Sequence, residues 1–178
     1  MIIRISFLFL TILLSYCQSQ NYSSSTVPFE ENFEQEMYQN PTIFKVDTFV
    51  DGDTFWVLNH EGNRVKIRLI GIDAPENKSV FNKKKHPFGA HAKAYVDSIL
   101  TSNPYIKLTF DIDSLDRYGR TLAYAYLNDG TFLNEKIIRE GYASLMTIPP
   151  NITYENLFYE AQVYAREHAL GIWKDSIQ

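Results

Sequence analysis

The chain has 178 residues, of which 45% are hydrophobic and 21% are charged, which suits one globular domain with a real core. Its formal net charge is −4. Proteins that hold nucleic acid through overall charge are usually basic, because their affinity comes from neutralising phosphates. The composition therefore excludes a tight, purely electrostatic nucleic-acid binder and leaves only local sites built from a few cations.

The N-terminal residues have the layout of an export signal. Arg4 is followed by the apolar run 5–14, which is shorter than a membrane-spanning helix requires, and we interpret residues 1–17 as a signal peptide. The only cysteine, Cys17, ends a segment similar to a bacterial lipobox, although Tyr16 stands where a small residue is usual. Lipid anchoring through Cys17 and simple cleavage with release are both open. A lone cysteine excludes an internal disulfide.

Residues 18–41 are rich in Ser, Asn, Gln and Glu and show no sustained apolar period, so we expect a polar, mobile leader. The folded domain is predicted to span residues 42–174. It begins with a three-strand meander, because apolar and β-branched residues gather in short runs between turn residues. The predicted strands are 43–50, 54–58 and 64–72, the last with Val65, Ile67 and Leu69 on one face.

A polar loop is predicted at 77–87, and the later elements follow in regular order. They are a helix at 88–100, a strand at 105–112, a strand at 121–127, a helix at 132–140 and a final helix from about 153 to 170. The second predicted helix has Leu133 and Ile137 inward, and Thr153 is the expected cap of the last. Five short strands with a helix after the third favour an α+β fold with a mainly β core, a five-stranded OB-fold barrel with three helices.

We expect the apolar face of the first helix to contain Ala90, Ala94, Val96 and Leu100, and that of the last helix to contain Leu157, Ala161, Tyr164 and His168.

Two aspartates follow turns or strand ends and are candidates for a metal site. Asp53 follows the Asp51-Gly52 turn, and Asp73 is predicted to end the third strand. Two carboxylates with a backbone carbonyl and water form a hard oxygen site, which suits Ca²⁺ rather than Zn²⁺. The alternative for Asp53 is a structural role, in which its carboxylate caps the turn. The four histidines are scattered along the chain, and we expect each to be structural or solvated.

Three further side chains suit phosphate chemistry. Glu76 projects from the turn after Pro75 and is a candidate proton acceptor for attacking water, or else an exposed loop residue. Arg68 lies in an apolar strand and needs a partner, either a structural carboxylate or a phosphate. Arg120 is a second candidate phosphate ligand, and two arginines facing one phosphate would stabilise a five-coordinate transition state.

Arg117 and Tyr118 are candidate contacts to a neighbouring phosphate, with surface positions as the alternative.

From about Phe44 to Trp173 the chain resembles the staphylococcal (micrococcal) nuclease family, the thermonucleases. The resemblance rests on these segments: Val50–Thr54, Arg68–Glu76, Asp116–Tyr124, Asn134-Glu135 and Ala169–Trp173. It implies an OB-fold barrel, Ca²⁺-dependent hydrolysis of DNA and RNA, and products that carry a 3′-phosphate. Matched by position, it implies the following roles: calcium ligation by Asp53, Asp73 and the carbonyl of Ala74, general base catalysis by Glu76, phosphate binding by Arg68 and Arg120, and substrate contact by Arg117 and Tyr118.

One segment departs from the family pattern. Where the best-known member has two tyrosines that line the nucleotide pocket, this chain has 146–151 without a tyrosine, so base stacking there should be weaker. The leading hypothesis is an exported, calcium-dependent nuclease, a monomer acting on single-stranded DNA and RNA, secreted or anchored to the bacterial envelope as a lipoprotein. The alternatives are a non-catalytic OB-fold module that binds nucleic acid or protein, and a lipid-anchored interaction domain.

Overall fold

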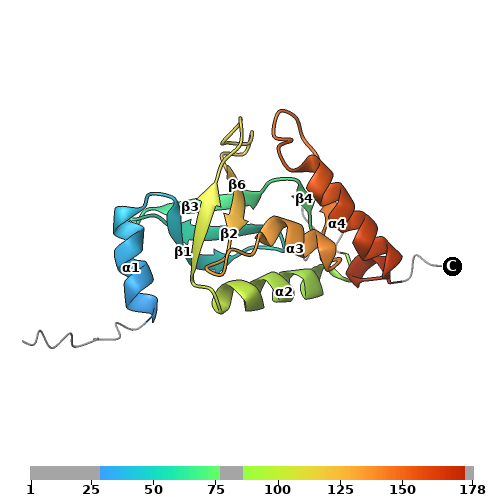
Figure 1. The fold of residues 1–178 in the computed structure, drawn as a ribbon, viewed down its shortest axis with the longest axis horizontal. Helices are drawn as coiled ribbons and strands as arrows, with labels where there is room; N and C mark the ends of the chain where they lie inside the picture. Colours follow the sequence, from blue (N-terminus) through green and yellow to red (C-terminus); the bar gives the residue numbers. More distant parts are fainter. Residues whose placement is uncertain (1–28, 77–85, 175–178) are drawn as a thin grey trace, which may run out of the picture.

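The computed structural model describes residues 29–76 and 86–174 (Figure 1). The predicted signal peptide, Cys17, the first part of the predicted leader and most of the predicted loop 77–87 lie outside the described residues. Within the described ranges, no helix combines the length and the apolar character needed to cross a membrane.

A closed barrel of five strands forms the centre of the domain, in the spatial order β1-β2-β3-β6-β5. The barrel strands are β1 (Ile43–Phe49), β2 (Thr54–Leu58), β3 (Arg64–Leu69), β5 (Tyr105–Thr109) and β6 (Thr121–Tyr126). β1, β2 and β3 form the predicted antiparallel meander, while β3 and β6 pair in parallel and close the barrel. The predicted α+β fold with a five-stranded barrel is confirmed.

Every second side chain of the barrel strands points into the barrel and forms its core. Ile67 and Leu69 of β3 are almost completely buried, as are Phe55 and Val57 of β2, and Val65 packs against the same core. Residues between them face outward because successive side chains of a strand point to opposite faces. Two short strands, β4 (Ile72–Asp73) and β7 (Ser144–Leu145), pair outside the barrel.

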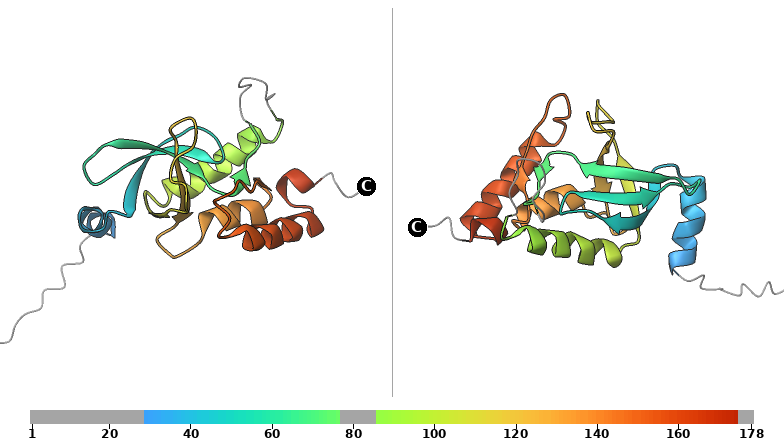
Figure 2. Two further views of the ribbon diagram at one scale, coloured as in Figure 1. Left: turned by 90° about the horizontal axis from the view of Figure 1, so that it is seen from above. Right: turned by 180° about the vertical axis from the view of Figure 1, so that it is seen from behind.

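The helices lie around and beyond the barrel (Figures 1 and 2). They are α1 (Phe29–Gln39), α2 (Gly89–Thr101), α3 (Leu133–Arg139) and α4 (Glu155–Glu167), with the 3₁₀ turn η1 (Gly171–Trp173) after them. α2 runs along the barrel, and α3 and α4 pack together at one end, with α1 at the opposite end (Figure 1). Leu133 and Ile137 of α3 are fully buried, as expected.

Helix α1 lies within residues 18–41, where a polar, mobile leader is predicted, so that prediction is wrong for Phe29–Gln39. Met37 is 5% exposed and packs in a small cluster with Ile43 and Tyr105, and Phe33 stacks on the Tyr105 ring. Phe33 and Met37 are one helical turn apart, so they form one narrow apolar stripe. Such a stripe within a polar segment is too short for periodicity to reveal, and its barrel partners become visible only in the fold.

Two predicted helix faces are correct only in part: Val96, Leu100 and Ala161 are buried as expected, but the other predicted members are not. In α2 the buried side chains of the helix include Ala92, Val96 and Leu100, while Ala90 and Ala94 are exposed. Alanine is tolerated on either face, so its positions did not fix the rotation of the helix.

In α4 the buried residues are Phe158, Ala161 and Ala165, whereas Leu157 is exposed. Thr153 does not cap this helix, because its hydroxyl instead donates to Asp111.

The third predicted strand ends earlier than expected, and this shapes the site. β3 stops at Leu69, and Gly71 has a φ of +80° that turns the chain out of the barrel into β4. A Cβ at Gly71 would lie 2.4 Å from Cε2 of Phe158, so only glycine allows this turn against α4. Asp73 therefore lies beyond a turn rather than at the end of a barrel strand.

Candidate active site

Asp53 connects the turn between β1 and β2 with the segment after β4. The residue is 5% exposed, and its Oδ2 accepts the backbone N–H of Ala74 at 2.7 Å. Its Oδ1 accepts the hydroxyl of Thr54 at 3.0 Å. A buried carboxylate needs such donors, because leaving its oxygens unsatisfied costs free energy. These bonds hold Ala74, the predicted carbonyl ligand, next to the predicted carboxylate ligand.

Arg68 lies between the two predicted metal-binding carboxylates. It is 6% exposed, and its Nη1 is 2.7 Å from Oδ2 of Asp53, while its Nη2 is 3.4 Å from Oδ1 of Asp73. The sequence left a structural carboxylate or a phosphate as the partner of Arg68. The carboxylates that contact it here are the candidate metal ligands themselves, so the guanidinium gathers both of them at one place.

The electrostatic environment of Asp53 favours an additional cation. Burial raises the pKa of Asp53 to about 7, the Arg68 guanidinium acts against this shift, and the neighbouring Asp51 carboxylate adds to it. Among the described residues, no group of three or more His, Cys, Asp or Glu is placed to hold a metal. The available donors are two carboxylates and a backbone carbonyl, and this hard oxygen set fits Ca²⁺ completed by water.

Gly52 allows the Asp53 turn to lie close to Ala74. A Cβ at Gly52 would lie 2.8 Å from Cβ of Ala74 and 3.3 Å from Cβ of Ala92. Any larger residue would therefore push the turn away from both α2 and Ala74. The glycine between Asp51 and Asp53 is required by space, in addition to its tendency to form turns.

Glu76 borders a groove of about 340 Å³ that Asp73 also lines. The groove is lined by Asp73, Ala74, Pro75, Glu76, His86, Ser144 and Ile172. Glu76 is half-buried, and its carbonyl accepts the backbone N–H of His86 at 2.9 Å. His86, which we expected to be structural or solvated, makes this backbone contact and lines the groove. Glu76 thus lies next to the predicted metal ligands, as its sequence position suggests.

Arg120 is oriented by Asp116, four residues earlier in the same loop. Its Nε donates to Oδ2 of Asp116 at 2.6 Å, and Oδ1 accepts the backbone N–H groups of Arg120 and Tyr118. Burial acts to raise the pKa of Asp116, but these hydrogen bonds and the Arg120 charge outweigh it and hold the pKa below its ordinary value. Asp116 is therefore an ionised support for Arg120.

The strand order places Arg120 beside the strand that contains Arg68. Thr121 and Leu122 of β6 pair in parallel with Ile67 and Arg68 of β3, and Arg120 immediately precedes them. Asn134, fully buried on α3, locks this arrangement. Its side chain accepts the N–H of Ala125 and donates to the carbonyl of Ile70, which joins β6 to the end of β3.

Arg117 and Tyr118 are on the surface of the same loop. Tyr118 is 67% exposed, and Arg117 donates to its hydroxyl at 2.7 Å while the guanidinium lies over the ring. The guanidinium of Arg120 lies over the same ring, 5.5 Å from its centre. The structure thus groups these two residues with Arg120, and it places them in solvent where a substrate has access.

The segment 146–151, which lacks the two tyrosines, is tied to the loop that contains Arg120. The side chain of Asn151 accepts the N–H of Asp113 and donates to its carbonyl, both at 2.8 Å. Ile148 is 60% exposed and occupies the tyrosine-free stretch. The segment keeps its contact with the loop through Asn151 while presenting an aliphatic side chain to solvent.

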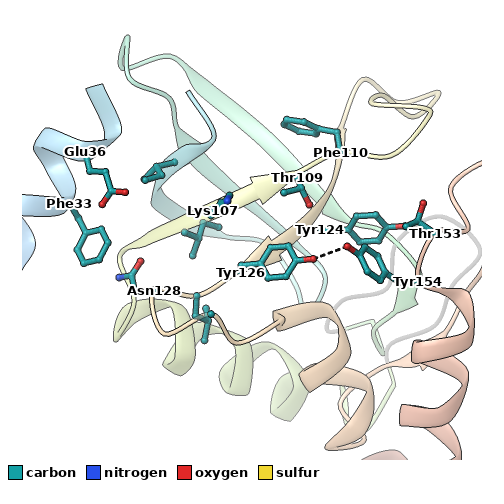
Figure 3. Close-up of a pocket in the computed structure, with 14 residues that line it drawn as sticks. Phe33, Glu36, Lys107, Thr109, Phe110, Tyr124, Tyr126, Asn128, Thr153 and Tyr154 are labelled. Atoms are coloured by element: carbon teal, nitrogen blue, oxygen red, sulfur yellow. Dashed lines mark hydrogen bonds between the residues drawn. The ribbon is translucent and has the colours of Figure 1, made fainter. Parts of the chain in front are cut away.

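A larger cleft of about 610 Å³ lies elsewhere, between α1, β5, β6 and the residues before α4 (Figure 3). Tyr126 and Tyr154 share a hydrogen bond of 3.2 Å across it, and Phe110 stands at its edge. None of the predicted site residues lines this cleft. Of the predicted site residues, Asp73, Ala74 and Glu76 line the smaller groove instead.

Sequence reasoning did not give Asp116 or Asn134 a role at the site. Asp116 was visible as a carboxylate four residues before Arg120, and Asn134 as a polar residue within the apolar stripe of a predicted helix. Both are supports that hold another residue in position. Their roles depend on hydrogen bonds that only the fold reveals.

Comparisons with known proteins identify the family. The family model described as "Staphylococcal nuclease homologue" matches residues 66–175, more than half of the chain. The thermonuclease of Staphylococcus intermedius is 37% identical over 131 residues, which cover 74% of this chain and 76% of that protein. The thermonuclease of Staphylococcus hyicus is 35% identical over 136 residues, covering 76% and 78%.

Endonuclease YncB of Bacillus subtilis (strain 168) is 31% identical over 160 residues, which cover 89% of this chain and 72% of that protein. Together with the five-stranded barrel and the cluster around Arg68, these matches show that the chain belongs to the staphylococcal nuclease family.

Proposed function

We propose that this protein is an exported, calcium-dependent nuclease that cleaves single-stranded DNA and RNA without selecting the sugar and leaves 3′-phosphate ends. That it is a nuclease, and so a phosphodiester hydrolase, follows from its family and from its nuclease-named relatives. The metal, the products, the substrate form and the place of action are the proposed part.

The observation that carries the proposal is the contact of one buried arginine with two carboxylates. Nη1 of Arg68 lies 2.7 Å from Asp53, and Nη2 lies 3.4 Å from Asp73, which lines the same groove as Glu76. A guanidinium has five N–H donors, so Arg68 can contact both carboxylates and still have donors for a phosphate. Two carboxylates around one arginine form a site suited to a dication and a phosphate together.

The residues have distinct roles in an in-line attack of water on phosphorus. Glu76 orients the attacking water and accepts its proton. Arg68 and Arg120 donate hydrogen bonds to the phosphate oxygens, whose negative charge grows in the transition state, and the 5′-oxygen leaves. Asp116 keeps Arg120 oriented through the 2.6 Å contact with Nε. Arg117 and Tyr118 contact the neighbouring part of the substrate.

Asp53, Asp73 and the carbonyl of Ala74 would hold Ca²⁺, which, when bound, supplies positive charge to the phosphate and acidifies bound water. Calcium is plentiful outside cells, which suits a site with few protein ligands. The export signal proposed for residues 1–17 agrees with that location, with the protein either released or anchored through Cys17 as a lipoprotein. We propose that it acts as a monomer.

The test is cleavage of single-stranded DNA and of RNA by the purified protein, in calcium or in excess EGTA. We expect cutting only with calcium, and a loss of at least about a hundredfold in kcat for Glu76→Gln and for Arg68→Ala. Glu61→Gln, an exposed glutamate in the turn between β2 and β3, is the matched control and should cut normally. Cutting that persists in EGTA would exclude the metal assignment, and oligonucleotide binding without any cutting would favour a binding module.

A further inference from the structure

The outer face of β3 presents a row of cations that begins at the proposed active site. Because Val65, Ile67 and Leu69 face the core, the alternate residues Arg64, Lys66 and Arg68 lie on the opposite face. Two residues along a strand span about 7 Å, so the row extends about 13 Å from Arg68. Arg68 pairs with Asp53 and Asp73, and Arg64 pairs with Asp47, so Lys66 is the one member of the row with no ion pair among the described residues.

The neighbouring strand adds an aromatic ring to this row. Trp56 of β2 pairs in register with Lys66, and Thr54 pairs with Arg68, so all four residues share one face of the sheet. The Arg64 guanidinium lies 4.6 Å from the centre of the Trp56 ring, and the Lys66 ammonium lies 5.6 Å from it. Trp56 is half-buried, and the chain has only two tryptophans.

Arg64, Lys66 and Trp56 differ in the contacts that they make within the protein. The guanidinium of Arg64 is fixed by Asp47, with Nε 2.8 Å from Oδ2, and by the hydroxyl of Thr48. Lys66 has no carboxylate within ion-pair distance among the described residues. Lys66 is thus the cation with charge to offer a ligand, while Arg64 and Trp56 form a fixed flat platform beside it.

We propose that this face, formed by Trp56, Lys66 and Arg64, binds the single-stranded part of the substrate that leads away from the cleaved phosphate. The inference rests on the proposed function and extends its site along β2 and β3. Lys66 contacts a backbone phosphate, and a base stacks on the platform, since indole and guanidinium planes both stack against bases. In OB-fold barrels, the face of the second and third strands is a position where oligonucleotides bind.

Two observations favour this occupant over another. Lys66 is two residues from Arg68 on the same face of β3, so a nucleic-acid strand bound at the active site would next meet Lys66. A cation without an ion pair beside an indole ring also matches the two parts of a nucleotide, a phosphate and a flat base, within one short stretch of the sheet. A single strand is favoured over a duplex because only unpaired bases present their planes for stacking.

The test separates substrate binding along this face from chemistry at the site. We would measure KM and kcat for a single-stranded oligonucleotide of about 12 nucleotides, within the range that one OB fold covers, and for a dinucleotide that reaches only the catalytic groove. For Lys66→Gln and for Trp56→Leu we expect KM for the longer substrate to rise about tenfold with kcat unchanged. The dinucleotide should be cut as by the unmodified protein.

Salt dependence distinguishes the two side chains. Each phosphate contact to a single strand contributes about 0.7 to the slope of log affinity against log salt concentration. Lys66→Gln should therefore lower the slope by about 0.7, Lys66→Arg should keep it, and Trp56→Leu should weaken binding with the slope unchanged. Lys107→Gln removes the same charge from an exposed position on β5 and should change neither KM nor the slope.

The possible outcomes test the proposed binding face separately from the proposed calcium-dependent cleavage. If both variants keep the KM of the unmodified protein for the longer substrate, or lose activity on the dinucleotide equally, the face serves the strand structure and the inference is overturned. If the unmodified protein cuts nothing, binding measured in EGTA by fluorescence polarisation still tests the face, while the proposed calcium-dependent cleavage fails. Unfolding midpoints of each variant identify any loss of folding, and Trp56→Phe then replaces Trp56→Leu.

Discussion

Asp111 and Thr153 meet across 42 residues of sequence. The hydroxyl of Thr153 donates to Oδ1 of Asp111 at 3.0 Å, and its backbone N–H donates to Oδ2 at 3.2 Å. The same Oδ2 accepts the hydroxyl of Tyr124 at 2.7 Å. One carboxylate thus joins the loop that leads to Arg120, the strand β6 and the start of α4. The position of the loop depends on this carboxylate being ionised.

The N–H of Ile112 also donates to this carboxylate, so we expect Asp111→Asn to destabilise the protein by about 1 to 3 kcal/mol at neutral pH, because it weakens four hydrogen bonds to a charged acceptor. Partial burial acts to raise the pKa of Asp111, but the bonds from Tyr124 and Thr153 lower it below the ordinary 3.8. A lowered folded-state pKa stabilises the fold above 3.8, and that contribution is lost as the pH falls through the folded value.

Urea unfolding at several pH values checks this prediction. The difference between Asp111→Asn and the unmodified protein should be constant near neutrality and shrink below about pH 4. Asp113→Asn, in the same loop, is the matched control, since only the backbone of Asp113 bonds to Asn151. A difference that does not change with pH would mean that the charge of Asp111 has no part in holding the loop.

Gly52→Ala should damage catalysis more than stability. The added methyl group would lie 2.8 Å from Cβ of Ala74, so the turn must move and take Asp53 with it. Because displacements of about 1 Å at a catalytic site can lower rates about a hundredfold, we expect kcat/KM to fall by about that factor. Gly62→Ala, at a glycine with a φ of +79° and open space around it, should lower the unfolding free energy but leave kcat/KM unchanged.

Asp116 should act on cleavage mainly through Arg120, whose side chain it contacts, while it holds Tyr118 only by the backbone. We expect Arg120→Ala to lower kcat about a hundredfold or more, and Asp116→Asn about tenfold, because Arg120 then loses the acceptor for its Nε. In the Arg120→Ala background, Asp116→Asn should have little further effect. Equal effects in both backgrounds would show that Asp116 supports the loop in general and not this arginine. Steady-state kinetics of the four proteins measure the coupling.

Calcium should stabilise the fold, and removing it should reverse the effect. At a free concentration of 100 times Kd, binding to the folded state alone adds about 2.7 kcal/mol to the unfolding free energy. Asp73→Asn should remove most of this gain, while Asp97→Asn on α2 should keep it. Thermal unfolding in calcium and in EGTA measures the gain independently of activity. No gain with the unmodified protein would reject the metal site formed by Asp53 and Asp73.

Local sequence signals predicted most of the fold. The meander followed from alternation, and the bounds of β2 at Thr54–Leu58 agree with the prediction because turns flank that strand on both sides. The signals failed where tertiary contacts decide the structure. The early end of β3 depends on Gly71 fitting against Phe158, and α1 depends on Met37 packing against Ile43 and Tyr105 of the adjacent strands β1 and β5. Neither contact leaves a periodic trace in the sequence.

The sequence predicted which residues form the candidate site, but not which of them contact one another. Asp53, Arg68 and Asp73 were each visible from residue type and spacing, and the structure brings them together. The direct contact of Arg68 with both aspartates was not predictable, because it depends on the turn at Gly71. Nor was the buried Asn134, whose side chain bonds to Ile70 and Ala125. Such links join residues far apart in the chain, where spacing gives no information.

The parallel pairing of β3 with β6 also governs when during synthesis the protein becomes active. Asp53, Arg68 and Asp73 are made early, but Arg68 gains its strand neighbour Leu122 only later, and the turn at Gly71 is completed by Phe158 later still. Ribosomes add about 5 to 20 residues per second, so a growing chain contains Asp53 and Asp73, the proposed metal ligands, for seconds before the site can form. Incomplete chains should therefore be harmless to the nucleic acids around them.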